Sequence, residues 1–292
     1  MQPKIGFIGL GSMGSAMVYR LQDLHYDITI KGNISRQAIE EALSRGATES
    51  NTCQNLASQV DVLMLCLDTS ENVESCIYGD DGILSGVKQD TVVIDFGTSL
   101  PSSTIKIGKD LASKGAHYLD APLGRTPVQA RVGKLNIMGA GDEKIFQSVL
   151  PILNDLGENV FFLGPLGTGH KIKLLNNFFA MTVACSMAEV FATASVAEVP
   201  LENVYKAMSA GPLHSGMMDF IRNYAIDGEI NLSFSISNAN KDVGYYAQMA
   251  TDLGIESKMS VAAKNALSEA ISGGYGDQFV PQITDFFRKS HL

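Results

Sequence analysis

Three glycines near the start of the chain, Gly9, Gly11 and Gly14, are the feature that most constrains its fold. They follow a short apolar run, Lys4–Ile8, and open a segment of helical character, Ser12–Leu24. Glycines at this spacing permit a tight strand-to-helix turn, and they let a ligand approach the backbone closely. The amides at the start of the helix then favour an anionic group. The pattern predicts a dinucleotide pyrophosphate site formed by Gly9, Leu10, Gly11, Ser12, Met13 and Gly14.

Strand and helix signals alternate through the first half of the chain. Val60–Leu67 and Thr91–Asp95 are nearly continuous apolar runs, as expected for strands covered on both faces. Pro101–Lys114 has the pattern of a helix, with a proline in its first turn and Gly115 just past its end. This alternation predicts an α/β fold with a parallel, doubly wound sheet of the Rossmann type. Further elements of the same pattern are expected at Asp27–Lys31, Arg36–Ser44, His117–Leu119, Lys134–Met138, Glu143–Leu156 and Val160–Phe162.

The composition changes after the glycine-rich segment 164–169, beyond which the signals are mostly helical. Ile172–Ala197 is long and apolar, and it carries small residues that permit close helix packing. We therefore predict an NAD(P)-binding Rossmann domain over residues 1–164, followed by an all-α domain for substrate binding and oligomerisation over residues 165–292. Its further helices are expected at Leu201–Ala207, Met217–Tyr224, Ile236–Leu253 and Val261–Ile271.

Composition excludes several classes of protein. The 292 residues are 45% hydrophobic and 18% charged, which suits two packed domains and argues against disorder. A net charge of −9 supplies no basic face for nucleic acid. Cysteines 53, 66, 76 and 185 form no CxxC pair and lie near no histidine cluster, so we expect reduced thiols, no metal site and a cytoplasmic location. The first apolar run is too short for a signal peptide and Phe178–Ala188 is too short to span a bilayer, so no membrane partner is expected.

The end of the second expected strand selects the dinucleotide. NAD enzymes usually carry an acid there that binds the ribose hydroxyls, but residues 30–36 contain none. Asn33 can bond a ribose hydroxyl, whereas Lys31 and Arg36 either neutralise a 2′-phosphate or stay solvated. We expect NAD(P)H and favour NADPH. Two residues that close the next strands, Leu67 and Thr98, complete the predicted cofactor site.

A lysine and two asparagines share one face of the first helix in the second half. Asn176 and Asn177 lie three and four residues beyond Lys173. Hydride transfer to an aldehyde carbon leaves negative charge on its oxygen, which an ammonium group stabilises and then protonates. Lys173 would need partial desolvation for this role, and a solvated helix start is the alternative interpretation. His170 and Lys171 fall on other faces and are expected at the surface.

The segment Leu119–Thr126 follows an expected strand of the first domain, and ligands bind beyond the carboxyl ends of such strands. The amides near Gly124, the hydroxyl of Thr126 and the guanidinium of Arg125 suit an anionic group. A surface salt bridge is the alternative for Arg125. In the C-terminal half, Lys241 either pairs with the adjacent aspartate at the surface or reaches the active site.

These motifs together resemble the β-hydroxyacid dehydrogenase family, which includes 3-hydroxyisobutyrate and tartronate semialdehyde reductases, along essentially the whole chain. Residues 5–14 are similar to its N-terminal signature and residues 120–123 to the start of its substrate loop. Gly169-x-x-x-Lys173-x-x-Asn176-Asn177 is similar to its catalytic helix, and Lys241-Asp242 to its C-terminal motif. The resemblance implies that Lys173 is catalytic and that Lys241 lies close to the nicotinamide.

Departures from the family pattern bear on the substrate. Most members carry Ser-Gly-Gly where this chain has Gly124-Arg125-Thr126, so the serine that usually holds the substrate carboxylate is absent. The triplet is similar to that of the 3-sulfolactaldehyde reductase branch, in which the arginine helps to bind a sulfonate. Gly97 replaces the usual serine before Thr98, and Lys134 stands where a threonine is common.

The sequence thus predicts an NAD(P)H-dependent reductase of a short anionic aldehyde, or the corresponding hydroxy acid dehydrogenase. Lys173 is the expected proton donor and Asn177 orients it or the substrate, which is bound by Gly124, Arg125, Thr126 and Asn176. The expected reaction converts 3-sulfolactaldehyde to 2,3-dihydroxypropane-1-sulfonate, with succinic semialdehyde and 3-hydroxyisobutyrate-type or tartronate-type semialdehydes as alternatives. A catalytically silent nucleotide-binding scaffold and an imine reductase are disfavoured by Lys173. By analogy of fold, we expect a homodimer or homotetramer.

Overall fold

The computed structural model describes residues 2–32 and 36–291. The chain divides into two compact units, Met1–Lys173 and Leu174–Leu292. The long helix α9 (Thr168–Val196) begins in the first unit and continues through the second. The first unit therefore extends past residue 164 and includes the opening turns of α9.

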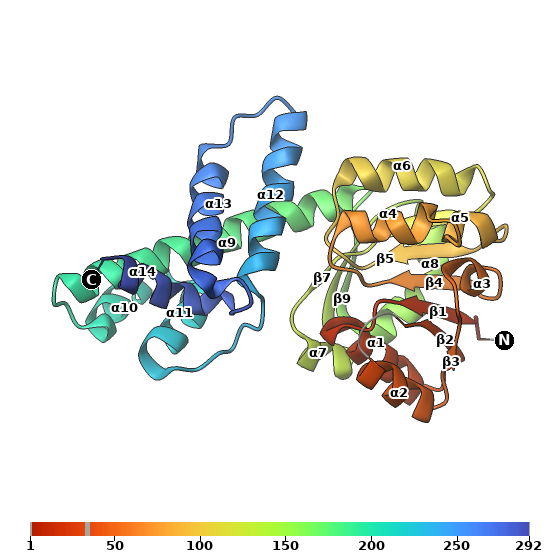
Figure 1. Ribbon diagram of the computed structural model, residues 1–292, viewed down its shortest axis with the longest axis horizontal. Helices are drawn as coiled ribbons and strands as arrows, with labels where there is room; N and C mark the ends of the chain where they lie inside the picture. The colour runs from red at the N-terminus through yellow and green to blue at the C-terminus, as the bar shows by residue number, and fades with distance from the viewer. Residues whose placement is uncertain (1, 33–35, 292) are drawn as a thin grey trace. The chain divides into compact units, whose positions relative to one another are not determined.

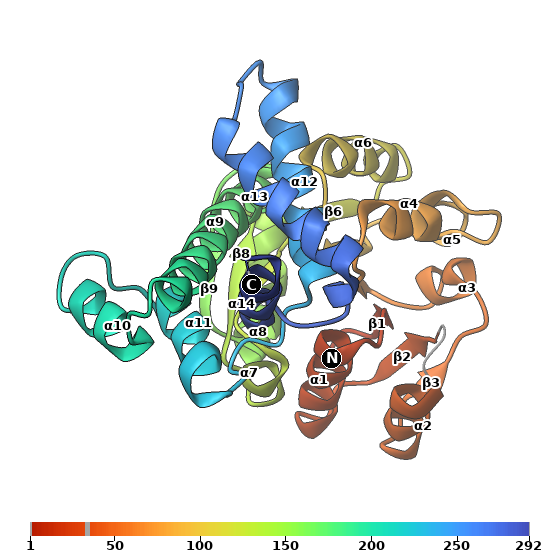
Figure 2. The same ribbon diagram turned by 60° about the vertical axis from the view of Figure 1, so that its left-hand side comes forward.

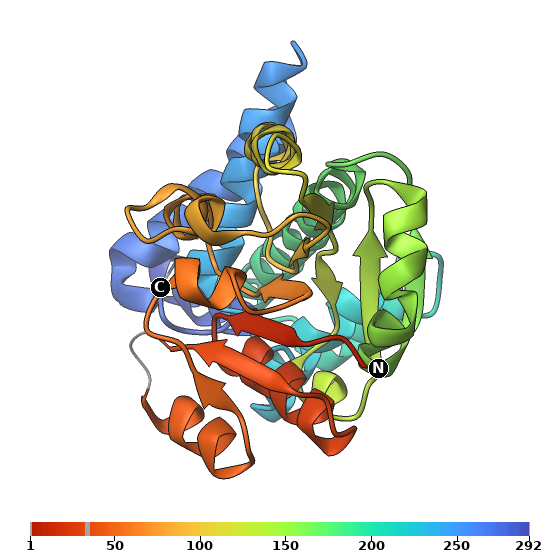
Figure 3. The ribbon, with the colours of Figure 1, turned by 90° about the vertical axis from the view of Figure 1, so that its right-hand side faces the viewer.

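A six-stranded parallel sheet forms the centre of the first unit, and Figure 3 shows its strands side by side in red to yellow. The strand order is β3-β2-β1-β4-β5-β6, and every neighbouring pair is parallel. This order confirms the Rossmann-type sheet predicted from the alternating pattern. The strands are β1 (Ile5–Ile8), β2 (Ile28–Lys31), β3 (Thr48–Glu49), β4 (Val62–Leu65), β5 (Val92–Asp95) and β6 (His117–Asp120).

Side chains along each strand alternate between two buried faces, which explains why these strands are almost wholly apolar. Phe7 and Met64 join one apolar cluster, whereas Ile8 and Leu65 join a second one across the sheet. The first cluster includes residues of α1 (Ser12–Asp23) and α2 (Arg36–Ser44). The second includes residues of α3 (Cys53–Ala57), α4 (Ser70–Tyr78), α5 (Ile83–Gly86) and α6 (Pro101–Ala112), and Figure 1 shows α4 to α6 together over that face.

The last three strands of the first unit form a separate sheet, with the order β7-β8-β9. β7 (Leu123–Gly124) pairs antiparallel with β8 (Leu135–Gly139), and β8 pairs parallel with β9 (Gly157–Phe162). The elements predicted at Lys134–Met138, Glu143–Leu156 and Val160–Phe162 thus do form a parallel strand–helix–strand unit, but they belong to a separate sheet, and the antiparallel strand β7 was not predicted. Only the short helix α7 (Pro127–Arg131) connects β7 to β8, and a parallel crossover needs a longer connection. Helix α8 (Glu143–Leu156) then connects β8 to β9.

The elements described in the second unit are helices joined by loops, as the sequence predicts. Its core contains Ala184, Ala188 and Phe191 of α9, packed with residues such as Val243 and Leu267. Figures 1 and 2 show α12 and α13 side by side, in agreement with their contacts. The elements after α9 are α10 (Leu201–Ser209), α11 (Gly216–Asp227), α12 (Ile236–Asp252), α13 (Lys258–Ala270), the π-helical turn η1 (Ile271–Tyr275), the 3-10 turn η2 (Val280–Gln282) and α14 (Ile283–His291).

Helix α9 is also long and apolar enough, by length and composition alone, to cross a membrane. The mean hydropathy of its qualifying stretch is 1.5, and 44% of that stretch is buried inside the protein. Its buried residues include Ala184, Ala188 and Phe191, which form the centre of the second unit's core. This packing accounts for the buried apolar residues of the helix, in line with the core helix expected from the sequence.

Candidate active site

In the glycine loop between β1 and α1, two glycines leave no room for a side chain (closed positions) and one faces open space (the open position). A Cβ placed on Gly14 would lie 1.9 Å from the carbonyl oxygen of Gly9, and a Cβ on Gly9 would lie 2.3 Å from that of Cys66. A Cβ on Gly11 would meet no atom within 4 Å. Gly11 is also the N-cap of α1, and no side chain of the described residues caps this helix start. The loop therefore presents bare amides to open space, which fits a pyrophosphate.

The ends of β4 and β5 lie close together at the same edge of the sheet. A Cβ on Gly97 would lie only 2.7 Å from the carbonyl oxygen of Leu67. This close approach explains why the chain has glycine where a serine is usual, because a side chain would push the two loops apart. Leu67 and Thr98 are both half-buried there, and β4 is the neighbour of β1. The structure thus places these predicted cofactor residues at the strand edge that carries the glycine loop.

An acid from the neighbouring strand β3 lies beside the end of β2, where residues 30–36 contain none. Glu49 is paired in register with Ile30, and its carboxylate accepts hydrogen bonds from Arg36 at 2.8 and 3.3 Å. The same carboxylate oxygen would lie 2.7 Å from a Cβ on Gly32. Lys31 donates from Nζ to the carbonyl oxygen of Gly32 at 2.7 Å. Asn33, which the sequence assigns to the ribose, lies outside the described residues.

Lys173 lies beside the substrate loop predicted from the sequence. It is half-buried on α9, and its Nζ donates a hydrogen bond to the carbonyl oxygen of Leu123 at 2.7 Å. Gly124 and Arg125 follow Leu123 directly, so the fold brings the ammonium group to a loop fifty residues earlier in the chain. The partial burial that acid catalysis requires of this lysine is present.

The two anion-binding side chains predicted in that loop already have protein partners. Arg125 forms an ion pair with Glu158 and donates from Nη1 to the carbonyl oxygen of Lys134 at 2.8 Å. Its backbone is left-handed, with φ of 76°, at a position where the family usually has glycine. Thr126 is the N-cap of α7 and forms a capping box with Gln129. An incoming anion must therefore compete with these contacts.

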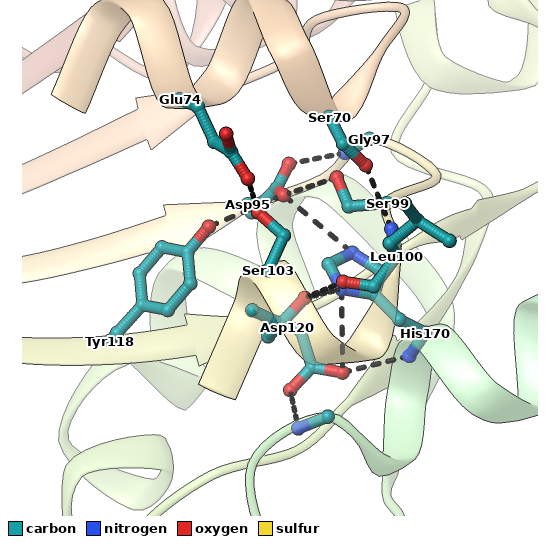
Figure 4. Close-up of polar contacts among 12 residues, drawn as sticks. Ser70, Glu74, Asp95, Gly97, Ser99, Leu100, Ser103, Tyr118, Asp120 and His170 are labelled. Atoms are coloured by element: carbon teal, nitrogen blue, oxygen red, sulfur yellow. Dashed lines mark hydrogen bonds and ion pairs between the residues drawn. The ribbon is translucent and has the colours of Figure 1, made fainter. Parts of the chain in front are cut away.

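His170 is fully buried, so the expectation that it lies at the surface was wrong. Its Nδ1 is 2.7 Å from the hydroxyl oxygen of Thr104, and its Nε2 is 3.7 Å from a carboxylate oxygen of Asp95. Figure 4 shows the ring between the buried carboxylates of Asp95 and Asp120. The helix start is buried because Gly169 packs against the second sheet, where a Cβ would lie 2.2 Å from the carbonyl oxygen of Met138. Lys171 is exposed, as expected.

Asp120 caps the start of α9. Its carboxylate accepts backbone hydrogen bonds from Gly167 and His170, both at 2.7 Å (Figure 4). Burial raises the pKa of Asp120, although the nearby imidazole of His170 and these amides oppose the rise. The aspartate of the substrate-loop motif thus positions the helix that carries Lys173. No local sequence signal indicates this role, because its partners lie 47 and 50 residues away.

In the second unit, Asp242 connects the two asparagines to Lys241. Asn177 donates from Nδ2 to Asp242 Oδ2 at 2.6 Å, and Asn176 donates to Asn177 Oδ1 at 3.1 Å. Lys241 Nζ forms an ion pair with Asp242 Oδ1 at 3.0 Å. Asp242 is only 1% exposed, so the Lys-Asp motif is not the surface pair considered from the sequence. These contacts fasten the α9 asparagines to α12.

Two family models cover almost the whole chain. Residues 4–164 match the model described as the NAD binding domain of 6-phosphogluconate dehydrogenase. Residues 167–284 match the model described as NAD-binding of NADP-dependent 3-hydroxyisobutyrate dehydrogenase. The first match alone spans more than half of the 292 residues.

Individual relatives agree with these models. The chain is 27% identical to 3-sulfolactaldehyde reductase of Escherichia coli over 98% of this chain and 96% of that protein. It is 26% identical to 2-hydroxy-3-oxopropionate reductase of the same organism, over 93% and 92% of the two chains. Among solved structures, 3-hydroxyisobutyrate dehydrogenase of Mycobacterium tuberculosis has the same fold, with a TM-score of 0.89 and 21% identity over 99% of this chain and 100% of that chain.

Proposed function

The chain belongs to the 3-hydroxyisobutyrate dehydrogenase-like (β-hydroxyacid dehydrogenase) family of NAD(P)-dependent oxidoreductases, and from this premise we propose that it reduces a short aldehyde bearing an anionic group. The observation that carries the proposal is the 2.7 Å hydrogen bond from Lys173 Nζ to the carbonyl oxygen of Leu123. This bond joins Lys173, which is suited to proton donation, with the loop Gly124–Thr126, which is suited to anion binding.

Lys173 is the proposed proton donor. When bound, NAD(P)H supplies the hydride that reduces the carbonyl carbon. The ammonium of Lys173 stabilises the negative charge that develops on the carbonyl oxygen and then protonates it. Lys173 donates to Leu123 at the predicted substrate loop, and Asp120 holds the helix that carries the lysine. We propose that Asn177 orients Lys173 or the substrate.

Arg125 is the proposed anion ligand, with the amide of Gly124 and the hydroxyl of Thr126 beside it. A guanidinium offers paired donors that fit the tetrahedral oxygens of a sulfonate or the planar oxygens of a carboxylate. Its present partner Glu158 is half-exposed, so a substrate anion can replace that carboxylate at low cost. Because this chain lacks the serine usual for carboxylate substrates, we propose 3-sulfolactaldehyde as the substrate, which agrees with the activity named for a 27% identical relative.

NADPH is the proposed cofactor. Lys31 and Arg36 place two cations near the end of β2, where a 2′-phosphate would lie, against the single carboxylate of Glu49. The balance of charge therefore favours the phosphorylated ribose. Fluorescence titration with NADPH and NADH would measure the two dissociation constants, and tighter binding of NADH would contradict the proposal.

Steady-state kinetics test the substrate. The purified enzyme would be assayed with 3-sulfolactaldehyde, succinic semialdehyde, tartronate semialdehyde and the semialdehyde of 3-hydroxyisobutyrate, each with NADPH and NADH. We expect the highest kcat/KM with the sulfonate. A carboxylate semialdehyde that matches or exceeds it would overturn the substrate, and inactivity with every aldehyde would overturn the reaction.

We also propose that the protein assembles as a homodimer or homotetramer. Leu175 and Phe179 lie one turn apart on α9, and their side chains are 50% and 70% exposed. Exposed apolar residues of this size on a long helix are typical of a face that another chain covers. Light scattering coupled to gel filtration would measure the mass, and a monomer at micromolar concentration would contradict the proposal.

A further inference from the structure

One buried side chain, His170, lies between three parts of the first unit that carry the candidate site. It belongs to the first turn of α9, three residues before Lys173. Its ring is fully buried, and Figure 4 shows it beside the loop after β5 and the end of β6. Burying an imidazole costs free energy unless its polar atoms are used, and the proposed reaction gives this ring no chemical step. The contacts of the ring therefore indicate a different role.

The hydrogen bonds around the ring determine which nitrogen carries a proton. The hydroxyl of Thr104 donates to the carbonyl oxygen of Leu100 at 3.1 Å. A hydroxyl has a single hydrogen, so Thr104 accepts from His170, whose Nδ1 donates at 2.7 Å. Nε2 has no hydrogen-bond partner within residues 2–32 and 36–291, although a carboxylate oxygen of Asp95 lies 3.7 Å away. The ring therefore holds its surroundings mainly through Nδ1.

The loop between β5 and α6, which carries the predicted cofactor residue Thr98, is fastened at both ends beside this ring. At the end of β5, the carboxylate of Asp95 accepts hydrogen bonds from the amide of Gly97 at 2.8 Å and the hydroxyl of Ser99 at 2.9 Å (Figure 4). At the other end, the carbonyl oxygen that Thr104 binds belongs to the N-cap residue of α6. The position of the ring therefore limits where the cofactor loop can lie.

The backbone of the same histidine is bound to the strand that leads to the predicted substrate loop. The amide of His170 donates to Asp120 Oδ2 at 2.7 Å, and Nδ1 of the ring lies 3.9 Å from that oxygen. Asp120 ends β6, three residues before Leu123, whose carbonyl oxygen accepts from Lys173. One residue thus connects the cofactor loop and the substrate strand to the helix turn that carries the lysine.

We propose that His170 is a positioning residue that holds Lys173 in place relative to the cofactor loop. The inference rests on the proposed function, in which Lys173 protonates the carbonyl oxygen while the carbonyl carbon is reduced. The two reacting groups must meet the same carbonyl, and a misplacement of about 1 Å can lower the rate by about 10²-fold. The ring is bound at the loop through Nδ1 and at the strand through its backbone amide, so it keeps the two sides of the site aligned.

Three replacements of the ring test which of its contacts matters. The side-chain nitrogen of asparagine can take the position of Nδ1, whereas that of glutamine takes the position of Nε2. His170→Asn should keep kcat within about threefold of the parent, and His170→Gln and His170→Leu should lower it by about 10–100-fold with little change in KM or in the dinucleotide Kd. Steady-state kinetics and fluorescence titration measure these quantities. An equal kcat in all three variants and the parent would overturn the proposal, as would a loss in His170→Asn as large as that in His170→Leu.

The partner of the ring offers a second test that leaves the histidine in place. Thr104→Val removes the acceptor and should reproduce the loss of kcat, whereas Thr104→Ser keeps the hydroxyl and should not. Combined with His170→Leu, Thr104→Val should lower kcat no further, because both changes remove the same hydrogen bond. Tyr118→Phe is the matched control, since it removes another buried hydroxyl, 3.3 Å from Asp95, and should keep the parent kcat. A normal kcat in Thr104→Val would contradict the proposal.

Hydrogen exchange separates this inference from the proposed function, because it requires no turnover. In His170→Leu, the amides of residues 96–100 and 167–173 should exchange about tenfold faster than in the parent or in His170→Asn. Circular dichroism would establish that each variant folds. If the parent reduces no aldehyde, the proposed function fails, and the exchange rates still decide whether His170 holds the loop and the helix start. Unchanged exchange in His170→Leu would overturn the positioning role.

Discussion

Two loops of the first unit are both suited to anions, yet they are built in opposite ways. The loop Gly9–Gly14 presents backbone amides, and its middle glycine faces open space. The loop Gly124–Thr126 presents side chains, and both of its functional side chains are already bonded to protein groups. The first loop is ready for its ligand, whereas the second must exchange partners to bind one.

The difference follows from what each loop has to recognise. A pyrophosphate is common to both nicotinamide dinucleotides, so a rigid array of amides serves without any choice of side chain. The substrate differs between members of the family, and under the proposed function side chains such as Arg125 carry that choice. The ion pair with Glu158 holds the guanidinium of Arg125 at the loop. The proposed function therefore assigns substrate specificity to the loop whose side chains can exchange partners.

The largest expected effect comes from Lys173, whose ammonium group is held at the second loop. Lys173→Ala removes the proton donor and should lower kcat by about 10²–10⁴ while the dissociation constant for the dinucleotide stays the same. Steady-state kinetics and fluorescence titration measure the two quantities. Lys171→Ala, which removes an exposed lysine two residues earlier, is the matched control and should retain activity. A normal kcat for the Lys173→Ala enzyme would show that Lys173 is not the proton donor.

The closed and open glycines of the first loop should respond differently to the same added methyl group. Gly14→Ala forces a Cβ towards the carbonyl oxygen of Gly9 and should lower the free energy of unfolding by about 1–3 kcal/mol. Gly11→Ala meets no protein atom, so it should leave stability unchanged and weaken dinucleotide binding by about tenfold. Urea unfolding and fluorescence titration separate the two effects. If Gly11→Ala lowered the free energy of unfolding as much as Gly14→Ala does, Gly11 would not face open space.

Arg125→Gln tests whether the second loop binds the anion. Loss of a charge-assisted contact of about 1.5–3 kcal/mol should raise KM for the anionic aldehyde roughly tenfold to hundredfold, with a smaller change in kcat. An uncharged aldehyde of similar size should be turned over equally well by both enzymes. If the variant loses activity equally with charged and uncharged aldehydes, Arg125 has a structural role instead.

The smallest effect should come from the partner of that arginine. Glu158 is an exposed residue of β9, so Glu158→Gln should leave the fold intact. The variant removes the carboxylate that competes with the substrate, so KM for the anionic aldehyde should fall a few-fold. The gain should shrink at high salt, because salt screens the exposed pair in the parent enzyme. An unchanged KM at low salt would show that Glu158 does not compete for Arg125.

Local patterns in the sequence are enough to predict the parallel sheet, the helical second unit and the placement of Lys173 on a helix. Each depends on residues within a few turns of one another, such as the glycines at positions 9, 11 and 14. The antiparallel pairing of β7 was missed because apolar runs indicate strands but not their direction.

Some residues of the candidate site could not be predicted from the sequence, for a different reason. Glu49 lies near the end of β2 only because β3 lies beside β2, and a search confined to residues 30–36 does not find it. His170 is buried because the start of α9 packs against the second sheet, although its helical position alone indicated the surface. Carboxylates of β5 and β6 lie 3.7 and 3.9 Å from its ring nitrogens. Asp242 is likewise recognisable as a partner of Asn177 only once α9 and α12 are packed. Side-chain partners far apart in sequence leave no periodic signal.

The cap that Asp120 places on α9 has a consequence for the order in which the chain folds. Before residues 167–170 are in place, the last strand of the main sheet ends in a carboxylate that lacks both of its amide donors, and burying it in that state costs about 1–3 kcal/mol or more. Asp120 and its two amide donors are 47 and 50 residues apart in the chain. Closing a loop of that length is entropically unfavourable until its contacts form. The sheet edge and the first turn of α9 should therefore consolidate together and late. A chain ended at residue 164, where the two family models part, would be cut inside a folding unit and not between two of them.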